Sequence, residues 1–378
     1  MTIEDADRLD DVAGLAATDA SDMLRTIATS AAQIRASLTA VRETDLARLA
    51  PDERPRAIVV TGMGGSGISG DVLAAAVGLG CPVPVVVHRG YGLPGWVGGA
   101  DLTIAVSCSG TTQETLSAAT EAARRGSRLA GIGTAGSPLE RICEQARGVF
   151  VPITRELSPR SSLWALSVPA LVMASRFGLL DLGPDEGDLE LAARRLETVA
   201  EICGPDRDSF SNPAKRLATE LAGSLPMIWG NGQVGAVAAT RAAAQLAENA
   251  KQPAIVGSLP EAHHNQVVCF DGDLTGDPSG ADLFRDRVEE PDPIQLRLVL
   301  VRDDADDPDA AARATVSERL ADDRGIAVSA IVAEGVPAVE RLASLIGVID
   351  YASVYLALMR GIDPTPITAI DELKRLLR

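Results

Sequence analysis

Short, continuous apolar stretches alternate with segments of helical periodicity along the first half of the chain. The stretches that predict buried strands are Arg56–Thr61, Val83–Val87, Leu102–Val106, Arg128–Ile132 and Val149–Pro152. Helical patterns cover residues 112–125, 137–146 and 161–177, and an amphipathic helix is expected over 19–48, packed on this domain. Continuous apolar strands that alternate with helices predict an α/β fold with a parallel, doubly wound sheet.

The second half repeats this plan. A strand at Met227–Gly230 and a helix at Val234–Ala250 are followed by a strand 24 residues after the turn glycine (254 − 230), against 23 in the first half (85 − 62). A polar insertion at about 271–296 then delays the next strand, Leu298–Val301. A further strand is expected at about 326–333, with helices at 310–323, 336–360 and 368–377. The repeat predicts two tandem α/β domains, 1–182 and 189–378, joined by a linker at 183–188.

A hydroxyl-rich loop, Ser107-Cys108-Ser109-Gly110-Thr111-Thr112, connects a predicted strand to a predicted helix. The free N–H groups at a helix N-terminus, together with hydroxyl donors, are suited to hold a phosphate. Thr111 and Glu114 also fit a capping box. An ordinary Ser/Thr-rich turn has the same local pattern. The second half carries Asp303 and Asp304 at the matching place, and carboxylates repel phosphate, so only the first domain is expected to bind one.

A glycine-rich loop, Gly62-Met63-Gly64-Gly65-Ser66-Gly67, follows the first strand and fits the dinucleotide fingerprint GxGxxG. A dinucleotide site also needs an acidic residue about 20 positions later, where this chain has His88 and Arg89. Arg89 would suit a 2′-phosphate, which leaves an NADP site open. The hydroxyl-rich loop has no role in such a site, whereas two loops at neighbouring strand ends would converge on one phosphate ester.

Three other segments carry candidate chemistry. The helix that ends at Glu248-Asn249-Ala250-Lys251 has the composition of a solvated helix end. His263 and His264 lie close to Glu261, but HExxH spacing is missing, so no metal site is predicted. Arg160 precedes an expected helix, where a cation opposes the helix dipole, and this favours a functional role.

Composition and charge limit the partners and the location that this protein can be expected to have. The net charge of −17 argues against nucleic acid and anionic membranes as partners. Five scattered cysteines indicate a reduced, cytoplasmic location, and the acidic N-terminus is no signal peptide. The longest apolar stretch, Val168–Leu180, contains Arg176 and Pro169 and is too short to span a bilayer, so a soluble protein is expected. Lysine is rare: of the 35 lysine and arginine residues, only Lys215, Lys251 and Lys374 are lysine. These lysines are either chance retentions or lie at positions that require a compact ammonium group.

Several motifs in order along nearly the whole chain resemble the SIS-domain (sugar isomerase) family. They are GMGGSGISGD, SCSGTTQET, SPRSS, AENAK, HHN and a lysine four residues from the C-terminus. Within that family the chain is most similar to the bifunctional phosphoglucose/phosphomannose isomerases. The resemblance implies two tandem SIS domains, each a parallel sheet flanked by helices. It also implies a hexose phosphate substrate, no cofactor or metal, and a homodimer with active sites at the subunit interface.

The resemblance further implies roles for individual residues. Glu248 matches the catalytic base, Arg160 the arginine that stabilises the enediolate, and His264 a ring-opening histidine supplied by the partner subunit. Lys374 matches the C-terminal lysine. The phosphate-binding positions are Gly64, Gly65, Ser66, Ser107, Ser109 and Thr112. Either histidine of the His263–His264 pair fits the motif, and the threonine linked to mannose phosphate is either Thr365 or Thr368.

These residue types fit the isomerisation of an aldose to a ketose through a cis-enediol. That reaction needs a carboxylate base, a cation near the developing oxyanion and an acid for ring opening. A phosphate that is bound away from the reacting carbons would position them. The alternative is a non-catalytic sugar-phosphate regulator, which would need the loops but not Arg160, Glu248, His264 and Lys374. The presence of all four favours the enzyme.

Overall fold

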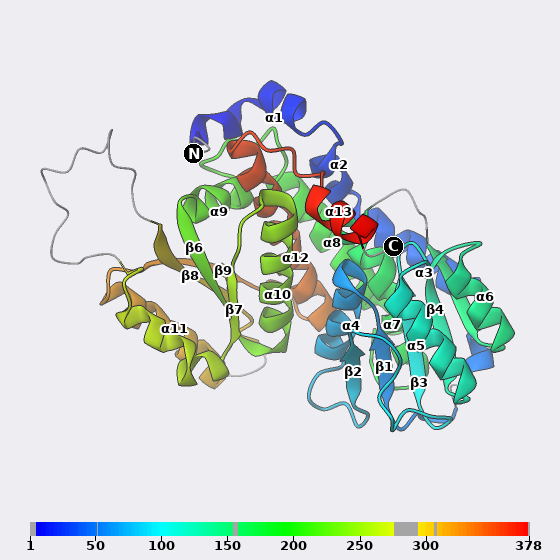
Figure 1. The fold of residues 1–378 in the computed structure, drawn as a ribbon. Helices are drawn as coiled ribbons and strands as arrows, with labels where there is room; N and C mark the ends of the chain where they lie inside the picture. The colour runs from blue at the N-terminus through cyan, green and yellow to red at the C-terminus, as the bar shows by residue number, and fades with distance from the viewer. Residues whose placement is uncertain (1–4, 51, 154–157, 276–293, 306–307, 377–378) are drawn as a thin grey trace, which may run out of the picture. The chain divides into compact units, whose positions relative to one another are not determined.

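The computed structural model describes residues 5–50, 52–153, 158–275, 294–305 and 308–376 (Figure 1). Contacts divide the chain into two compact units. The first unit comprises Ala28–Glu197 and Pro337–Ala343, and the second comprises Met1–Ile27, Thr198–Val336 and Ser344–Arg378. The N-terminal residues Met1–Ile27 therefore belong to the second unit, whereas the predicted limits placed them in the first domain. The domain limits 1–182 and 189–378 stay a prediction.

The first unit contains a five-stranded parallel sheet in the order β2-β1-β3-β4-β5. Its strands are β1 (Ile58–Thr61), β2 (Val85–His88), β3 (Leu102–Ser107), β4 (Arg128–Thr134) and β5 (Val149–Ile153). All five predicted strands are confirmed. Every residue of β1 and β3 is buried, because helices cover both faces of the sheet. This two-sided burial explains why the strands read as continuous apolar runs.

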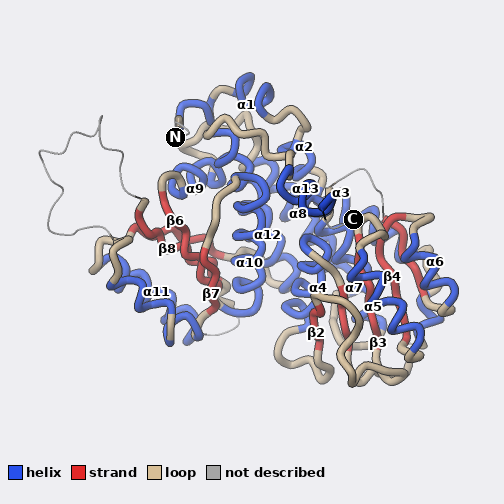
Figure 2. Tube along the Cα trace, viewed as in Figure 1, coloured by secondary structure: helices blue, strands red, loops and turns tan. Residues whose placement is uncertain are grey.

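The helices of the first unit lie in two layers (Figure 2). The helices are α3 (Ser30–Arg42), α4 (Gly64–Val77), α5 (Gln113–Arg124), α6 (Pro138–Gln145), α7 (Leu163–Arg176) and α8 (Gly187–Ile202), with 3-10 turns η2 (Leu46–Leu49), η3 (Pro159–Ser161) and η4 (Pro184–Glu186). α5 and α6 share a buried apolar cluster with one face of the sheet. α4 and α7 pack together, and α3 packs along α7. The helix expected over 19–48 is two helices in the structure, and the expected linker at 183–188 contains η4 and the start of α8.

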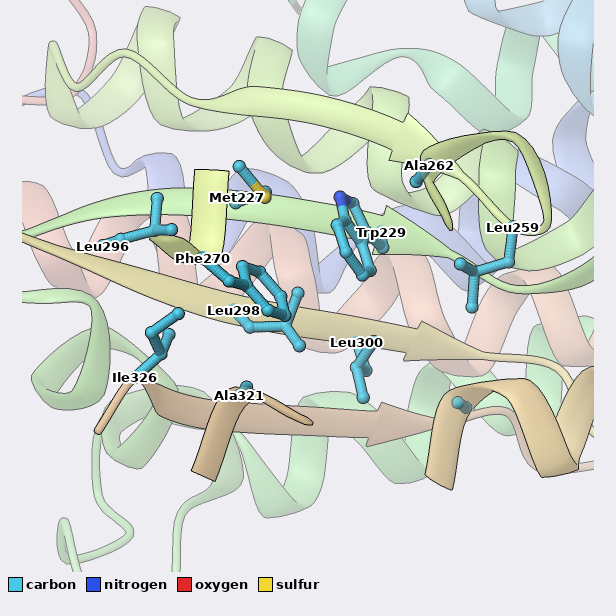
Figure 3. Packing of buried hydrophobic residues seen from close by; sticks show 11 residues of the cluster. Met227, Trp229, Leu259, Ala262, Phe270, Leu296, Leu298, Leu300, Ala321 and Ile326 are labelled. Atoms are coloured by element: carbon cyan, nitrogen blue, oxygen red, sulfur yellow. The ribbon is translucent and has the colours of Figure 1, made fainter. Parts of the chain in front are cut away.

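The second unit contains a four-stranded parallel sheet in the order β7-β6-β8-β9. Its strands are β6 (Ser224–Gly230), β7 (Ile255–Ser258), β8 (Gln295–Arg302) and β9 (Ala327–Val332). This order repeats β2-β1-β3-β4 of the first unit, which confirms the internal repeat. On one face, Trp229 stacks on Phe270 at a ring-centroid distance of 5.3 Å, within an apolar cluster that includes Met227 and Leu298 (Figure 3).

The helical elements of the second unit come from the N-terminal segment and from the part of the chain after residue 198, and the first residues of α12 belong to the first unit. They are η1 (Ala6–Asp10), α1 (Val12–Thr18), α2 (Met23–Ala28), α9 (Pro213–Leu221), α10 (Gly232–Ala250), η5 (Glu261–His264), η6 (Gln266–Asp271), α11 (Pro308–Asp322), α12 (Ala338–Met359) and α13 (Thr368–Leu376). α12 is long and apolar enough to cross a membrane by length and composition alone, so Val168–Leu180 is not the longest apolar segment. However, 94% of its apolar window is buried inside the protein, as in the core helix of a soluble protein.

Buried polar contacts tie these elements together. The Arg241 guanidinium on α10 donates two hydrogen bonds to the Asp350 carboxylate on α12, at 3.0 and 2.8 Å. Lys215 on α9 is fully buried, and its Nζ donates to the carbonyls of Pro205 (2.9 Å) and Arg207 (2.6 Å). Breaking a buried ion pair such as Arg241–Asp350 leaves an uncompensated charge, so this contact fixes α10 against α12.

The predicted insertion at 271–296 lies largely outside the described residues. At its edges, the Leu296 N–H donates to the Leu274 carbonyl at 2.7 Å, which closes the insertion at the start of β8.

Candidate functional site

The two loops predicted to share a phosphate meet in the first unit. β1 and β3 are parallel neighbours with Thr61 opposite Ala105, so both strands end at the same edge of the sheet. Each strand leads through its loop into a helix, α4 or α5. The Cys108 N–H donates to Ser66 Oγ at 3.3 Å, which joins the loop after β3 to the first turn of α4. The sequence therefore predicted this convergence correctly.

The hydroxyls of the loop after β3 form two pairs. Ser107 Oγ lies 2.9 Å from Thr112 Oγ1, and Ser109 Oγ lies 2.9 Å from Thr111 Oγ1. The N-cap of α5 is Thr112, without a side-chain cap hydrogen bond, so the capping box predicted for Thr111 and Glu114 is wrong. Thr111 is bonded to Ser109 instead of capping the helix. The N-terminus of α5 thus keeps its capacity to bind an anion.

The glycine-rich loop brings a second helix N-terminus to this edge of the sheet. α4 begins at Gly64, after the N-cap Met63, which makes no side-chain cap hydrogen bond. Gly64 has φ +52°, a left-handed conformation that favours glycine. Arg89, the residue that would suit a 2′-phosphate, is ion-paired with Asp71 of α4. This pairing leaves the NADP interpretation without support.

A third segment, Pro159–Ser162, packs against both loops. A Cβ built on Gly65 would lie 2.7 Å from the Pro159 carbonyl oxygen and 3.1 Å from the Arg160 nitrogen. Only a glycine permits this close approach. Ser162 Oγ lies 3.9 Å from Cys108 Sγ, so the segment also contacts the hydroxyl-rich loop. Arg160 is only 3% exposed and lies on η3, directly before α7.

Seven predicted site residues therefore gather around one end of the first sheet. They are Gly64, Gly65, Ser66, Ser107, Ser109, Thr112 and Arg160. Two helix N-termini without side-chain caps and several hydroxyls supply hydrogen-bond donors, and a buried guanidinium adds positive charge. The arrangement suits the phosphate group of a small ester.

Glu248 belongs to the second unit, in the last turn of α10, and its side chain is half-buried. The neighbouring side chains bond to α12: Gln245 Nε2 donates to Asp350 at 3.1 Å, and Asn249 Nδ2 donates to Ser353 Oγ at 2.9 Å. These buried contacts fix the helical turn that carries the Glu248 carboxylate.

The two neighbouring histidines have different environments. His263 Nε2 lies 2.7 Å from Ser317 Oγ of α11, and its ring packs edge-on against Trp229. Burial, with the nearby charges of Arg313 and His264, lowers the pKa of His263. His264 is exposed. The structure therefore separates a half-buried histidine that packs against the sheet from one whose ring is accessible.

Glu248 and His264 of one chain lie at opposite edges of the second sheet. α10 runs antiparallel to the strands, so Glu248 lies roughly 24 Å from Gly232 along the helix, at 1.5 Å for each of 16 residues (248 − 232). The Leu259 N–H donates to the carbonyl of Gly230, the last residue of β6, at 2.9 Å. The segment that leads to His264 therefore begins at the carboxyl ends of the strands, opposite to the end where Glu248 lies. α10 and α11 also cover opposite faces of this sheet (Figure 1).

The C-terminal candidates lie on an exposed helix and the loop before it. Lys374 is an exposed residue of α13. Thr365 is half-buried between Pro364 and Pro366, whereas Thr368 is exposed at the start of α13.

The matching edge of the second sheet is acidic, as expected. Asp304 pairs with Arg302 at 2.7 Å and accepts a hydrogen bond from Asn231 Nδ2 at 3.4 Å. Asn231 is the N-cap of α10. A carboxylate therefore lies where the first unit has hydroxyls.

Comparisons with known proteins identify the family of this chain. Residues 210–377 match the model of the bacterial phospho-glucose isomerase C-terminal SIS domain. The chain is 33% identical to a bifunctional phosphoglucose/phosphomannose isomerase from Caldicellulosiruptor bescii, over 85% of this chain and 89% of that protein. A protein of the same name from Aquifex aeolicus is 29% identical, over 87% of this chain and 93% of its own length.

A solved structure is similar in fold. The C-terminal domain of glucosamine-fructose-6-phosphate aminotransferase from Francisella tularensis superposes with a TM-score of 0.68 and 14% identity, over 91% of this chain and 98% of that domain.

Proposed function

Because the chain belongs to the family of bifunctional phosphoglucose/phosphomannose isomerases, we propose that it interconverts glucose 6-phosphate and mannose 6-phosphate with fructose 6-phosphate. The observation that carries the proposal is the meeting of the glycine-rich loop, the hydroxyl-rich loop and the Arg160 segment at one end of the first sheet. These residues offer donors to a phosphate and a cation to a developing oxyanion.

In this reaction the phosphate is bound by Ser66, Ser107, Ser109 and Thr112, with the glycines Gly64 and Gly65 allowing close backbone approach. Glu248 removes the proton from C2 of the open-chain aldose and returns it to C1. The hydroxyl proton moves from O2 to O1 during the same interconversion, so the sugar is neither oxidised nor reduced overall. Arg160 stabilises the negative charge on the enediolate oxygens.

Ring opening requires an acid at the ring oxygen and a base at the C1 hydroxyl. We assign it to His264 of the partner subunit, assisted by Lys374. The separation of Glu248 and His264 across one sheet supports this, since one chain does not supply both to the same place. The active enzyme is then a cytoplasmic homodimer with sites at the subunit interface.

The regulator hypothesis is not favoured, because a binder needs no residues of the Glu248 and His264 type. The Glu248→Gln variant separates the two functions. We expect kcat to fall at least ~10³-fold, as for the loss of general base catalysis, while the binding of fructose 6-phosphate changes by less than about threefold. Wild-type protein that binds all three hexose 6-phosphates without turnover would instead support a regulator. Comparing kcat/KM for glucose and mannose 6-phosphate then sets the substrate preference.

A further inference from the structure

The turn that carries Glu248 ends in an unusual backbone conformation. Lys251 is the C-cap of α10 with φ +57° and ψ 30°, the left-handed region. Glycine commonly occupies this position at helix ends, and a lysine there costs on the order of 1 kcal/mol. A lysine at a place that favours glycine therefore points to a role for its side chain.

The Lys251 ammonium binds carbonyl oxygens from two segments far apart in the sequence. Nζ donates to the Glu248 carbonyl at 2.5 Å and to the Pro366 carbonyl at 2.7 Å, with Pro364 O at 3.5 Å. The second segment leads from α12 into α13, and Figure 1 shows it beside the C-terminal end of α10. One side chain therefore connects the Glu248 turn to the segment that precedes Lys374.

Lysine fits this arrangement better than arginine. Its three donors share one nitrogen and can point to three converging carbonyls, whereas arginine presents a planar fork suited to carboxylates. Only three of the 35 basic residues in the chain are lysine. Lys215 shows the same bonding, since its Nζ donates to the carbonyls of Pro205 and Arg207. Two of the three lysines thus bind clusters of backbone carbonyls.

We propose that Lys251 is a positioning residue of the isomerase reaction. It holds the Glu248 turn and the segment Pro364–Pro366 together, so that the catalytic carboxylate and the start of α13 keep a fixed relation. This inference rests on the proposed function, because it requires Glu248 to be the base.

Other contacts close the same helix end without the Lys251 side chain. The Gln252 N–H donates to the Leu246 carbonyl at 3.1 Å, and Arg360 Nη1 donates to the Ala250 carbonyl at 3.5 Å. Gln252 Nε2 also donates to the Ser224 carbonyl at 3.0 Å. Loss of the ammonium therefore removes its hydrogen bonds to the Glu248 turn and to the 364–366 segment, while these other contacts at the end of α10 remain.

The test is Lys251→Gly in the full-length enzyme. Glycine adopts the left-handed conformation without strain, so the helix end is retained and only the ammonium is lost. Arg147→Gly is the matched control, because Arg147 has φ +56°, follows the end of α6 and is exposed. We expect Arg147→Gly to melt at or slightly above the wild-type temperature, and Lys251→Gly, which loses the ammonium hydrogen bonds, to stay folded. Arg147→Gly keeps full activity, whereas Lys251→Gly lowers kcat about 10-fold with KM within twofold, since phosphate binding is untouched.

Two further variants complete the test. Lys251→Met keeps the length of the side chain without its donors and should show the same fall in kcat. Lys251→Arg keeps the charge and should recover part of it. Wild-type kcat in folded Lys251→Gly and Lys251→Met overturns the proposal. Loss of folding in both variants also overturns it, because the role is then structural. If Glu248→Gln stays active, the proposed function itself fails, whereas an inactive Glu248→Gln with a fully active Lys251→Gly removes only the role of Lys251.

Discussion

Gly65→Ala tests how closely the Arg160 segment lies against the phosphate loops. The added Cβ would meet the Pro159 carbonyl oxygen at 2.7 Å and its carbon at 2.9 Å. An ordinary van der Waals contact begins near 3.4 Å. The backbone at residue 65 and the backbone at Pro159 must therefore separate by about 0.7 Å (3.4 − 2.7). The atoms in conflict are backbone, which cannot rotate away as a flexible side chain would.

The consequence follows from this displacement. Overpacking a tight contact costs about 1–3 kcal/mol of stability. Moving Arg160 by several tenths of an ångström relative to the phosphate loops misaligns the cation with the oxyanion. Misplacements of about 1 Å cost up to 10²-fold in rate, so we expect kcat/KM to fall roughly 10- to 100-fold.

The assay is kcat/KM with glucose 6-phosphate together with urea unfolding. Two glycine variants serve as controls. Gly64 has φ +52° and open space around its Cβ, so Gly64→Ala isolates the cost of backbone strain, on the order of 1 kcal/mol. Gly80 has neither constraint, and Gly80→Ala should change stability by less than about 0.5 kcal/mol and leave activity intact. Gly65→Ala with wild-type kcat/KM and stability would refute the close approach.

Three further outcomes follow from the same structure. Thr112→Ala should raise KM roughly 10-fold, because it removes a hydroxyl from the phosphate site. Thr120 is an exposed threonine later on α5, and Thr120→Ala should leave KM unchanged. Equal KM values for the two variants would contradict the assignment of Thr112 to the phosphate site. Burial lowers the pKa of His263 below the ordinary 6.5, so the unfolded chain binds more protons and the free energy of unfolding falls as pH drops below 6.5. His263→Gln should remove this slope in pH-dependent urea unfolding, and an unchanged slope would exclude His263 as its source. Arg241→Met should lower stability by about 3–5 kcal/mol because Asp350 is left buried and charged, and adding Asp350→Leu should restore most of it.

Much of the fold was predictable from the sequence. Strands buried on both faces appear as continuous apolar runs, and each predicted strand of the first unit is present. The convergence of the two loops was also predictable, because adjacent parallel strands end at the same edge of a sheet. The repeat extended the prediction to the second unit, including its acidic edge at Asp303 and Asp304.

What could not be predicted depends on contacts between segments distant in sequence. The residues around Lys251 have the composition of an ordinary helix end. Only the folded chain brings the carbonyls of Pro364 and Pro366 to the Lys251 ammonium. The N-cap of α5 is Thr112 because Thr111 bonds to Ser109, a competition that spacing cannot reveal. Two signals in the sequence involved Lys251, the rarity of lysine and the AENAK motif, and neither gave the partners of its ammonium.

A subunit-mixing experiment tests the central claim most directly. Glu248→Gln and His264→Asn homodimers should each be nearly inactive, since each lacks one catalytic group at both sites. Unfolding and refolding them together in equal amounts makes about half of the dimers mixed. Each mixed dimer would hold one intact site, with Glu248 from one subunit and His264 from the other, so about a quarter of wild-type activity should return. No recovery in proven mixed dimers would contradict an active site shared between subunits.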